Sequence, residues 1–425
     1  MLQPIIGFAG MSHLGVNTAA ATAERGFDTL CYDMDESLIQ KLNKQELLII
    51  EPGLPELFSK NILANRLKFS DNVRQLYDCD IVYISSDVPT DDKGVSDLST
   101  IHVLIQKVSE NLNPNAILVI LCQVPPGFTR TLQKFIPLAH LYYQVETLIF
   151  GKAVDRALFP ERFIIGCADP NIELNKSFKN LLCAFDCPIL TMKYESAELA
   201  KISINSYLVA NISVANMLSE ICEKMGANWS EIVPALRLDK RIGSYSYIIP
   251  GLGIAGGNLE RDMTTILRLS EQYGTDNGIV KSWLYNSQYR KDWVLNILHQ
   301  KVFSHHMHPI LAILGLTYKE NTNSIKNSPS LALLEYLKTY TLQVYDPAVQ
   351  CAILPLEMNK SSVEEAIRDA DVLIIMTPWD EFKKLTPSAL KKHMSGKIII
   401  DPYRVLEENI FKSDFEYLTL GAATC

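Results

Sequence analysis

Short apolar runs, each about as long as a β-strand, recur at helix-length intervals through the first 195 residues. They are bounded by Gly, Pro or Asp and read IIGFAG (5–10), DTLCYD (28–33), DIVYISS (80–86), AILVILC (116–122) and RFIIG (162–166). A strand that is apolar throughout is buried on both faces, which is typical of a parallel sheet covered by helices on each side. The pattern predicts a doubly wound α/β domain over residues 1–195.

A long helical pattern follows this region. From Ser196 to Gly226, apolar residues recur at three- and four-residue spacing, and a helix of that length joins domains or forms a dimer interface. The strand pattern then returns in PILAILGLTY, TLQVYDP, DVLIIMTP and GKIIIDP. We therefore predict an α/β fold of two Rossmann-like domains, at 1–195 and 301–425, joined by a helical domain at 196–300.

Composition excludes several classes of protein. The net charge is −8 and no basic run occurs, which argues against nucleic-acid binding. No apolar run reaches the roughly 18–20 residues that a membrane span needs. The nine cysteines show no CxxC pair, which suits a reducing compartment in which most cysteines are small buried apolar residues. We expect a cytoplasmic protein that binds neither nucleic acid nor membrane.

The first apolar run leads into a glycine-containing turn and an alanine-rich helix. The turn reads Gly10-Met11-Ser12-His13-Leu14-Gly15, and Asp33 ends the next predicted strand. This is the dinucleotide-binding fingerprint with serine in place of the second glycine, and the pyrophosphate is expected at the helix N-terminus. Asp33 is expected to bind the adenosine ribose hydroxyls, which favours NAD over NADP. The alternative is a related fold that has lost its cofactor.

Two further features point to chemistry. The segment GLGIAGGNLERD (251–262) is rich in glycine, which is typical of places where the backbone must approach another group closely. Lys201 and Asn205 share one face of the long helix; a helix lysine usually extends to water, but a buried one can hold an oxyanion.

Three histidines of the predicted linker, at 305, 306 and 308, lack partners at ligand spacing, so we predict no metal site.

Taken together, these motifs resemble the UDP-glucose/GDP-mannose dehydrogenases, NAD-dependent enzymes that oxidise the C6 alcohol of a nucleotide sugar to a carboxylate. The resemblance covers nearly the whole chain. It is carried by the Gly10–Gly15 turn, EPGL (51–54), DLS (97–99), VPPG (124–127), PER (160–162), AELAKISINSYL (197–208), DKRIG (239–243), the glycine-rich segment, LGLTYKENTNSIKNSP (314–329), VYDP (344–347) and TPWDEF (377–382). DKRIG and NTNSIKNSP are most similar to the UDP-glucose branch. The resemblance implies a homodimer that binds NAD and a UDP-sugar in a cleft between the two Rossmann-like domains.

The resemblance also implies roles for individual residues. Lys201, Asn205 and Asp262 match the family's catalytic Lys, Asn and Asp, and Glu146 matches the first Glu of its E-F-x-x-E-G segment, here ETLIFG. The implied substrate contacts are Gly253 and Gly256 in the loop that carries the sugar, Lys319 on the nucleotide, Arg241 inserted by the partner subunit, and Arg404, which follows Tyr403 at the position of the family's D-G-R arginine.

Several positions depart from the family pattern. The cysteine that attacks the intermediate aldehyde, and so leads to a thioester, is Asn258 here; the second Glu is Phe150, a Thr that precedes V-P-P-G is Gln123, and an Asp is Arg156. An amide is not a nucleophile. The sequence therefore predicts an NAD-dependent nucleotide-sugar oxidoreductase that carries out the first, two-electron oxidation and lacks the usual route to the second.

Two other functions stay open. One is a four-electron UDP-glucose 6-dehydrogenase whose second step is non-covalent, and the other is a catalytically silent protein that binds a nucleotide sugar or NAD. Purely structural roles also stay open for three residues: Lys201 in an interdomain ion pair, Asp262 as a helix N-cap, and Asn258 as a turn former.

Overall fold

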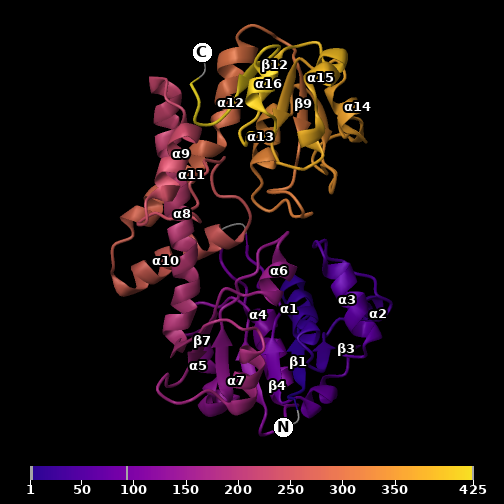
Figure 1. Cartoon of the computed structure of the whole chain (residues 1–425), viewed down its shortest axis with the longest axis vertical. Helices are drawn as coiled ribbons and strands as arrows, with labels where there is room; N and C mark the ends of the chain where they lie inside the picture. Colours follow the sequence, from indigo (N-terminus) through magenta and orange to yellow (C-terminus); the bar gives the residue numbers. More distant parts are fainter. Residues whose placement is uncertain (1–2, 92–93, 424–425) are drawn as a thin grey trace. The chain divides into compact units, whose positions relative to one another are not determined.

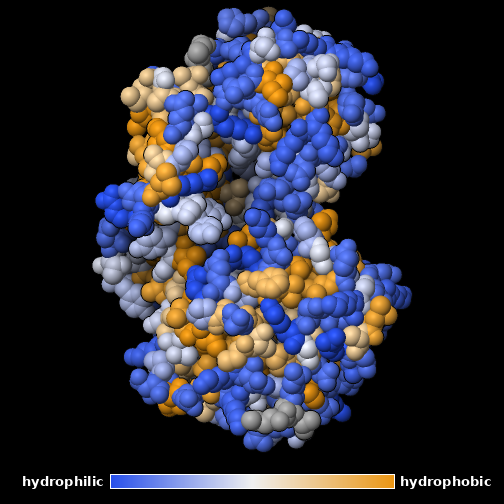
Figure 2. Space-filling view, viewed as in Figure 1, coloured by the Kyte–Doolittle hydropathy of each residue, from blue (hydrophilic) through white to orange (hydrophobic). Residues whose placement is uncertain are grey.

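The computed structural model describes residues 3–91 and 94–423. The chain divides into two compact units, Met1–Ile204 and Asn205–Cys425, which are called unit 1 and unit 2 below (Figure 1). Hydrophilic residues predominate on the face of each unit that Figure 2 shows, with hydrophobic patches among them. Within the described ranges, no helix has the length and apolar character needed to cross a membrane.

Unit 1 is built on an eight-stranded sheet with the order β3-β2-β1-β4-β5-β6-β7-β8. All neighbouring pairs are parallel except β6 and β7. The strands are β1 (Ile6–Ala9), β2 (Thr29–Tyr32), β3 (Leu67–Ser70), β4 (Ile81–Ile84), β5 (Ile117–Ile120), β6 (Leu141–Gln144), β7 (Phe163–Cys167) and β8 (Ile189–Lys193). The chain reverses its direction of winding between β1 and β4, and open α/β sheets bind ligands at that point.

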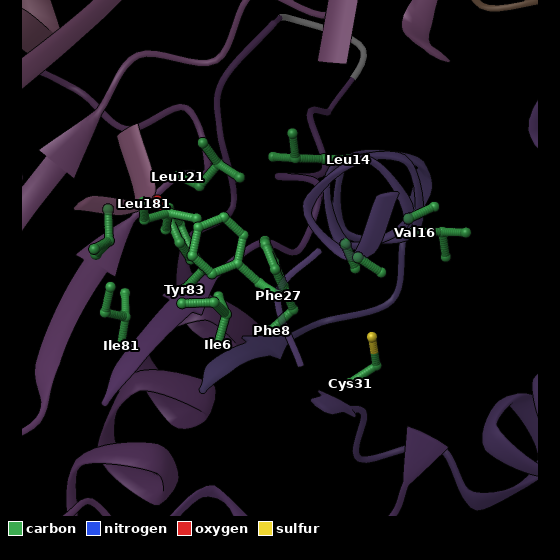
Figure 3. Packing of buried hydrophobic residues seen from close by; sticks show 14 of the residues in the cluster. Ile6, Phe8, Leu14, Val16, Phe27, Cys31, Ile81, Tyr83, Leu121 and Leu181 are labelled. Carbon is green, nitrogen blue, oxygen red and sulfur yellow. The ribbon is translucent and has the colours of Figure 1, made fainter. Parts of the chain in front are cut away.

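The helices of unit 1 cover both faces of this sheet. They are α1 (His13–Glu24), α2 (Glu36–Asn43), α3 (Leu54–Leu63), α4 (Ser99–Ser109), α5 (Phe128–Thr131), α6 (Ala153–Leu158) and α7 (Lys176–Cys183). Alternate residues of one strand belong to opposite cores: Ile81 and Tyr83 to one, Val82 and Ile84 to the other. Figure 3 shows the first core, in which the rings of Phe8 and Tyr83 stack with centroids 4.9 Å apart. The continuous apolar runs are thus explained by burial on both faces.

The long helix α8 (Tyr194–Met225) begins among the residues of unit 1 and ends among those of unit 2. It stops immediately before Gly226, whose φ is +80°. A glycine in this left-handed conformation is a common helix terminator. The predicted long helix is confirmed.

Unit 2 contains a parallel five-stranded sheet with the order β10-β9-β11-β12-β13. The strands are β9 (Ile310–Leu314), β10 (Thr341–Tyr345), β11 (Val372–Ile375), β12 (Ile398–Ile400) and β13 (Glu416–Leu418). Its helices are α9 (Trp229–Leu238), α10 (Asn258–Tyr273), α11 (Gly278–Lys291), α12 (Trp293–Leu298), α13 (Pro329–Leu337), α14 (Val363–Ile367), α15 (Pro387–His393) and α16 (Glu408–Phe411). Two apolar cores flank the sheet.

The predicted fold class is confirmed, because every predicted strand is present and the two sheets are of the α/β type. Four strands escaped prediction: β3, β6, β8 and β13. The boundaries at residues 195 and 300 remain a prediction. Of the eight described cysteines, none of which forms a disulfide, six are buried; Cys425 lies outside the described residues.

Candidate active site

The Gly10–Gly15 turn lies between β1 and α1, at the point where the winding of the unit 1 sheet reverses. Gly10 has a φ of +101°, and a Cβ there would lie 2.7 Å from the backbone nitrogen of Ser86. A Cβ at Gly15 would lie 1.9 Å from the carbonyl oxygen of Gly10. Both positions therefore require glycine, the first for its backbone conformation and the second for the close packing of α1.

The N-terminus of α1 remains open to an anion. Ser12 occupies the N-cap position but its side chain makes no capping hydrogen bond. Its hydroxyl instead donates to the carbonyl of Ser85 (3.2 Å) and accepts from the N–H of Asp87 (2.8 Å). The first amides of a helix have no intrahelical partner, so those of His13, Leu14 and Gly15 are available to a phosphate. The turn fits a dinucleotide pyrophosphate, and serine at the second glycine position ties it to the loop after β4.

Asp33 follows β2, beside the glycine turn. One carboxylate oxygen accepts from the N–H of Met11 (2.7 Å) and the other from the N–H of Asp35 (2.9 Å). Each carboxylate oxygen can accept more than one hydrogen bond, so these contacts orient Asp33 and leave acceptor capacity for ribose hydroxyls.

Glu51, the first residue of the EPGL motif and not a predicted site residue, connects three segments of unit 1. Its buried carboxylate accepts from Nε2 of His13 (2.8 Å) and from the N–H groups of Gly151 (3.0 Å) and Ala153 (2.7 Å). The ring of Phe150 stacks on that of His13, with centroids 4.0 Å apart. Burial raises the pKa of Glu51, but the hydrogen bonds from His13 and the two amides outweigh it and hold the pKa below its ordinary value. Glu51 therefore fixes the first residue of α1 through a charged group.

Lys201 and Glu146 form an ion pair within unit 1. The Nζ of Lys201 lies 3.3 Å from Oε2 of Glu146, and the two side chains are 11% and 15% exposed. The other carboxylate oxygen of Glu146 accepts from the N–H of Leu148. Lys201 is thus a mostly buried ammonium beside a carboxylate of its own unit, and the interdomain ion pair considered for it stays a prediction.

Glu198, one turn before Lys201, escaped the sequence analysis. Its buried carboxylate accepts from the N–H groups of Gly127 (2.5 Å) and Thr129 (2.8 Å), and so holds the end of the VPPG loop. Burial raises the pKa of Glu198. Gln123 lies between β5 and this loop. An acidic residue inside an apolar stretch of a predicted helix was the only available signal.

Asn205 and Asp262 meet in unit 2. The Nδ2 of Asn205 donates to Oδ2 of Asp262 (2.5 Å), whose side chain is buried. The Nε of Arg261 lies 3.5 Å from the other oxygen of Asp262. Because α10 begins at Asn258, Asp262 lies in the second turn of the helix, and the N-cap role considered for it is wrong. Asn258 itself is the exposed first residue of α10 and not part of a turn.

The glycines that precede α10 approach other parts of unit 2. Gly253 has a φ of +78°, and a Cβ there would lie 2.3 Å from the carbonyl oxygen of Ser287. Gly256 has a φ of +75°, and a Cβ there would lie 3.0 Å from the ring of Tyr318. The packing of the protein itself is therefore sufficient reason for these two glycines; their predicted contact with substrate remains a prediction.

The remaining predicted residues, all in unit 2, each make contacts of their own. Arg241 is exposed in the loop after α9, where Asp239 lies 2.6 Å away. The ammonium of Lys319 lies 5.6 Å from the ring centroid of Tyr318. Arg404 has a φ of +54°. Its guanidinium pairs with Glu408 and donates to Oδ1 of Asn228 and the carbonyl of Leu420, both at 3.3 Å. These bonds tie Arg404 to its own unit.

Models of the three domains of one protein family match the chain. The NAD binding domain of the UDP-glucose/GDP-mannose dehydrogenase family matches residues 5–183, the central domain 195–287, and the UDP binding domain 312–408. The chain belongs to the UDP-glucose/GDP-mannose dehydrogenase family. The predicted family and the predicted cofactor, NAD, are thereby confirmed, and a UDP-binding domain is present.

Relatives of known function match over almost the full length of the chain. The UDP-glucose 6-dehydrogenase of Rickettsia conorii is 29% identical, with 98% of this chain and 99% of that protein covered. The UDP-glucose 6-dehydrogenase of Rhizobium meliloti is 27% identical, with 98% and 99% covered.

Solved structures of other proteins share the fold of this chain. A UDP-D-ManNAc dehydrogenase from Pyrococcus horikoshii has a TM-score of 0.85 at 24% identity, covering 99% of this chain and 100% of that one. A UDP-glucose dehydrogenase from Pyrobaculum islandicum has a TM-score of 0.85 at 23% identity, with 99% and 98% covered.

Proposed function

We propose that this protein is an NAD-dependent oxidoreductase of a UDP-sugar that oxidises one alcohol to a carbonyl group and stops there. The observation that carries the proposal is Asn258 at the head of α10. By the order of the glycine-rich segment, and by its spacing to Asp262, Asn258 occupies the position of the family's nucleophilic cysteine. An amide cannot add to an aldehyde and later leave as a thiolate does.

The first oxidation needs a hydride acceptor, a base, and a cation beside the reacting oxygen. NAD, when bound, supplies the hydride acceptor, and the open amides of α1 together with Asp33 would hold it. Asp262, buried and oriented by Asn205, is the base, directly or through a water that Asn205 would also hold. Lys201 steadies the negative charge that develops on the oxygen, while Glu146 keeps the ammonium in place.

Two other functions have specific support. A four-electron UDP-glucose 6-dehydrogenase that oxidises the hydrated aldehyde without a covalent intermediate is supported by the names of the relatives. A silent binding protein is supported by the departures at Gln123, Phe150 and Arg156. Arg156 donates to the carbonyl of Thr147 (2.6 Å) and lies 3.2 Å from Glu161, so it holds the loop at residue 147. Its guanidinium stays protonated and cannot act as a general base.

A homodimer is part of the proposal. The portion of α8 in unit 2 exposes a row of apolar side chains at spacings of three, four and seven residues: Tyr207, Val214, Met217, Ile221 and Met225. Such a stripe is typical of a helix that packs on a partner. Val214→Asp combined with Ile221→Asp is expected to convert a dimer to a monomer in sedimentation; an unchanged mass would contradict this interface. Cytoplasmic localisation stays a prediction.

The test of activity is NADH formation with a panel of UDP- and GDP-sugars. The proposal predicts NADH with at least one UDP-sugar, and a greatly reduced rate from the same sugar with Asp262→Asn. If no sugar of the panel yields NADH while NAD and UDP-glucose both bind in calorimetry, the silent function is correct and the proposal fails.

A further inference from the structure

Asn327 lies in the segment between β9 and α13, in an unusual backbone conformation. Its φ is +52°. Residues other than glycine seldom adopt this left-handed region, although asparagine tolerates it better than most. Such a conformation persists where surrounding contacts hold it, and functional sites are enriched in it.

The side-chain amide of Asn327 reaches the glycine-rich segment and the first turn of α10. Its Nδ2 lies 3.1 Å from the carbonyl oxygen of Ile254, 3.4 Å from that of Gly256 and 2.9 Å from Oε2 of Glu260. The two amide hydrogens are thus shared among three acceptors. The neighbouring carbonyl of Lys326 accepts from the N–H of Gly256 (3.1 Å), so residues 326 and 327 both bond to the backbone of the loop.

Lys291, at the end of α11, decides which way this amide points. Its Nζ lies 2.5 Å from Oδ1 of Asn327. An ammonium has hydrogens to donate and no acceptor, so it must face the amide oxygen, and the NH₂ group of Asn327 is thereby directed at the carbonyls of the loop. Burial lowers the pKa of Lys291, while the charges of Glu260 and Asp292 act in the opposite direction.

Two buried side chains, those of Leu252 and Ile254, anchor the loop that these contacts hold, but its glycines contribute no anchor. Residues 251–257 contain four glycines, and glycine has the largest conformational freedom in the unfolded chain. Gly253 and Gly256 adopt left-handed conformations, and neither has a side chain whose contacts could hold that conformation. The shape of the loop therefore depends on partners from elsewhere in unit 2, and Asn327 contacts it at two carbonyls.

We propose that Asn327 is a positioning residue that holds the loop of residues 251–257, and with it Asn258, in the conformation that receives the sugar of the substrate. The sugar-binding part rests on the proposed function, whereas the hold on the loop does not. Asn327 contacts the loop rather than the reacting atoms, and no catalytic role is assigned to it.

The variant that isolates the amide is Asn327→Gly, because glycine keeps the left-handed backbone and removes only the side chain. The matched control is Asn321→Gly, an exposed asparagine of the same segment with a φ of +57°. The rate of hydrogen exchange at the amides of 251–258 in the ligand-free protein measures how firmly the loop is held. Calorimetry measures the affinity for UDP-glucose, which the loop is proposed to affect, and the affinity for NAD, which shows whether unit 1 is unchanged.

For Asn327→Gly, we expect about tenfold faster exchange in 251–258 and about tenfold weaker binding of UDP-glucose, the effect of losing roughly one well-placed hydrogen bond. NAD affinity, and both readouts in Asn321→Gly, should match the unaltered protein. Asn327→Asp should act in the same direction, because it keeps the contact with Lys291 and turns an oxygen towards the loop carbonyls; it decides the matter if Asn327→Gly does not fold.

Equal exchange in the 327 and 321 variants would overturn the proposal. Faster exchange with unchanged affinity for UDP-glucose would overturn its sugar-binding part. If the unaltered protein binds no UDP-glucose but the exchange difference remains, the proposed function fails and the hold on the loop stands.

Discussion

The two glycine-rich turns of this protein both lead into helices, and they are held in different ways. The first, at Gly10–Gly15, is held by close packing of backbone on backbone, because a Cβ at Gly10 would meet the backbone of Ser86 and one at Gly15 the carbonyl oxygen of Gly10. The second, at 251–257, is held by distant side chains, among them Tyr318 and Asn327. Both helices begin without a capping side chain.

The difference continues at the first residue of each helix. His13 of α1 is hydrogen-bonded to the buried carboxylate of Glu51, whereas Asn258 of α10 is exposed and uncharged. The first turn presents uncapped helix amides, and its supporting contacts lie inside unit 1. The second turn keeps its buried Asn205–Asp262 pair, and the departure that limits the proposed chemistry lies at Asn258. The comparison teaches that one turn is supported by a buried charge, whereas the other relies on uncharged contacts from elsewhere in its own unit.

The largest expected effect is in the chemistry of the second turn. Asp262→Asn should lower the rate of NADH formation by about a thousandfold, because it removes the proposed base while keeping the shape of the side chain. Initial rates at saturating UDP-sugar and NAD measure the effect. Glu271→Gln, an exposed change on the same helix, serves as the control and should be neutral. Equal rates in the two variants would mean that Asp262 is structural.

The next largest effect is expected from a substitution that disrupts the packing of the first turn. Gly15→Ala places a Cβ 1.9 Å from the carbonyl oxygen of Gly10 and should weaken NAD binding by about a hundredfold, since overpacking of this kind costs a few kcal/mol. UDP binding should be unaffected. The control is Gly278→Ala, where a Cβ meets nothing closer than 3.4 Å. Tight NAD binding by Gly15→Ala would contradict the role given to the turn.

A smaller effect tests the charge that supports the first turn. Because the pKa of Glu51 is lower in the folded than in the unfolded protein, its carboxylate stabilises the fold above the ordinary glutamate pKa of 4.5, and this contribution is lost as pH falls through the lower folded value. Glu51→Gln should therefore lower the free energy of unfolding by about 1–3 kcal/mol at neutral pH, and less in acid.

Thermal unfolding across pH measures the Glu51 effect. Glu56→Gln, on the exposed side of α3, provides the comparison and should show no pH-dependent difference. A loss of stability in Glu51→Gln that persists unchanged in acid would mean that shape, not charge, is what Glu51 contributes.

The smallest expected effect sharpens the comparison at the second turn. Asn258→Cys restores a thiol at the N-terminus of α10, a position that favours the thiolate, and should yield a minor amount of carboxylate product. Mass spectrometry of the sugar product detects it, with Asn258→Ser as the control. Complete inactivity of Asn258→Cys, in a protein that still binds both ligands, would favour the silent function.

Much of the fold was predictable because buried parallel strands are continuous apolar runs, as in β4 and β5. The strand β8 was missed because none of its residues is fully buried, so its sequence carries little signal. The N-cap role of Asp262 was wrong because α10 begins after Gly257, which has no side chain to mark the start.

Lys201 and Asn205 were predictable as a pair because they share one helix. Glu51 and Asn327 were not, because each joins segments about 70 to 100 residues apart, and no periodicity or local spacing encodes such contacts. Sequence patterns therefore located the helices and turns of the candidate site but not the groups that hold them.

The central claim is that oxidation stops at the carbonyl, and the most direct measurement is the amount of NADH formed per UDP-sugar consumed, with the product identified by mass spectrometry. The account predicts one NADH for each sugar and a product with a new aldehyde or ketone. Two NADH for each sugar, with a carboxylate product, would contradict it.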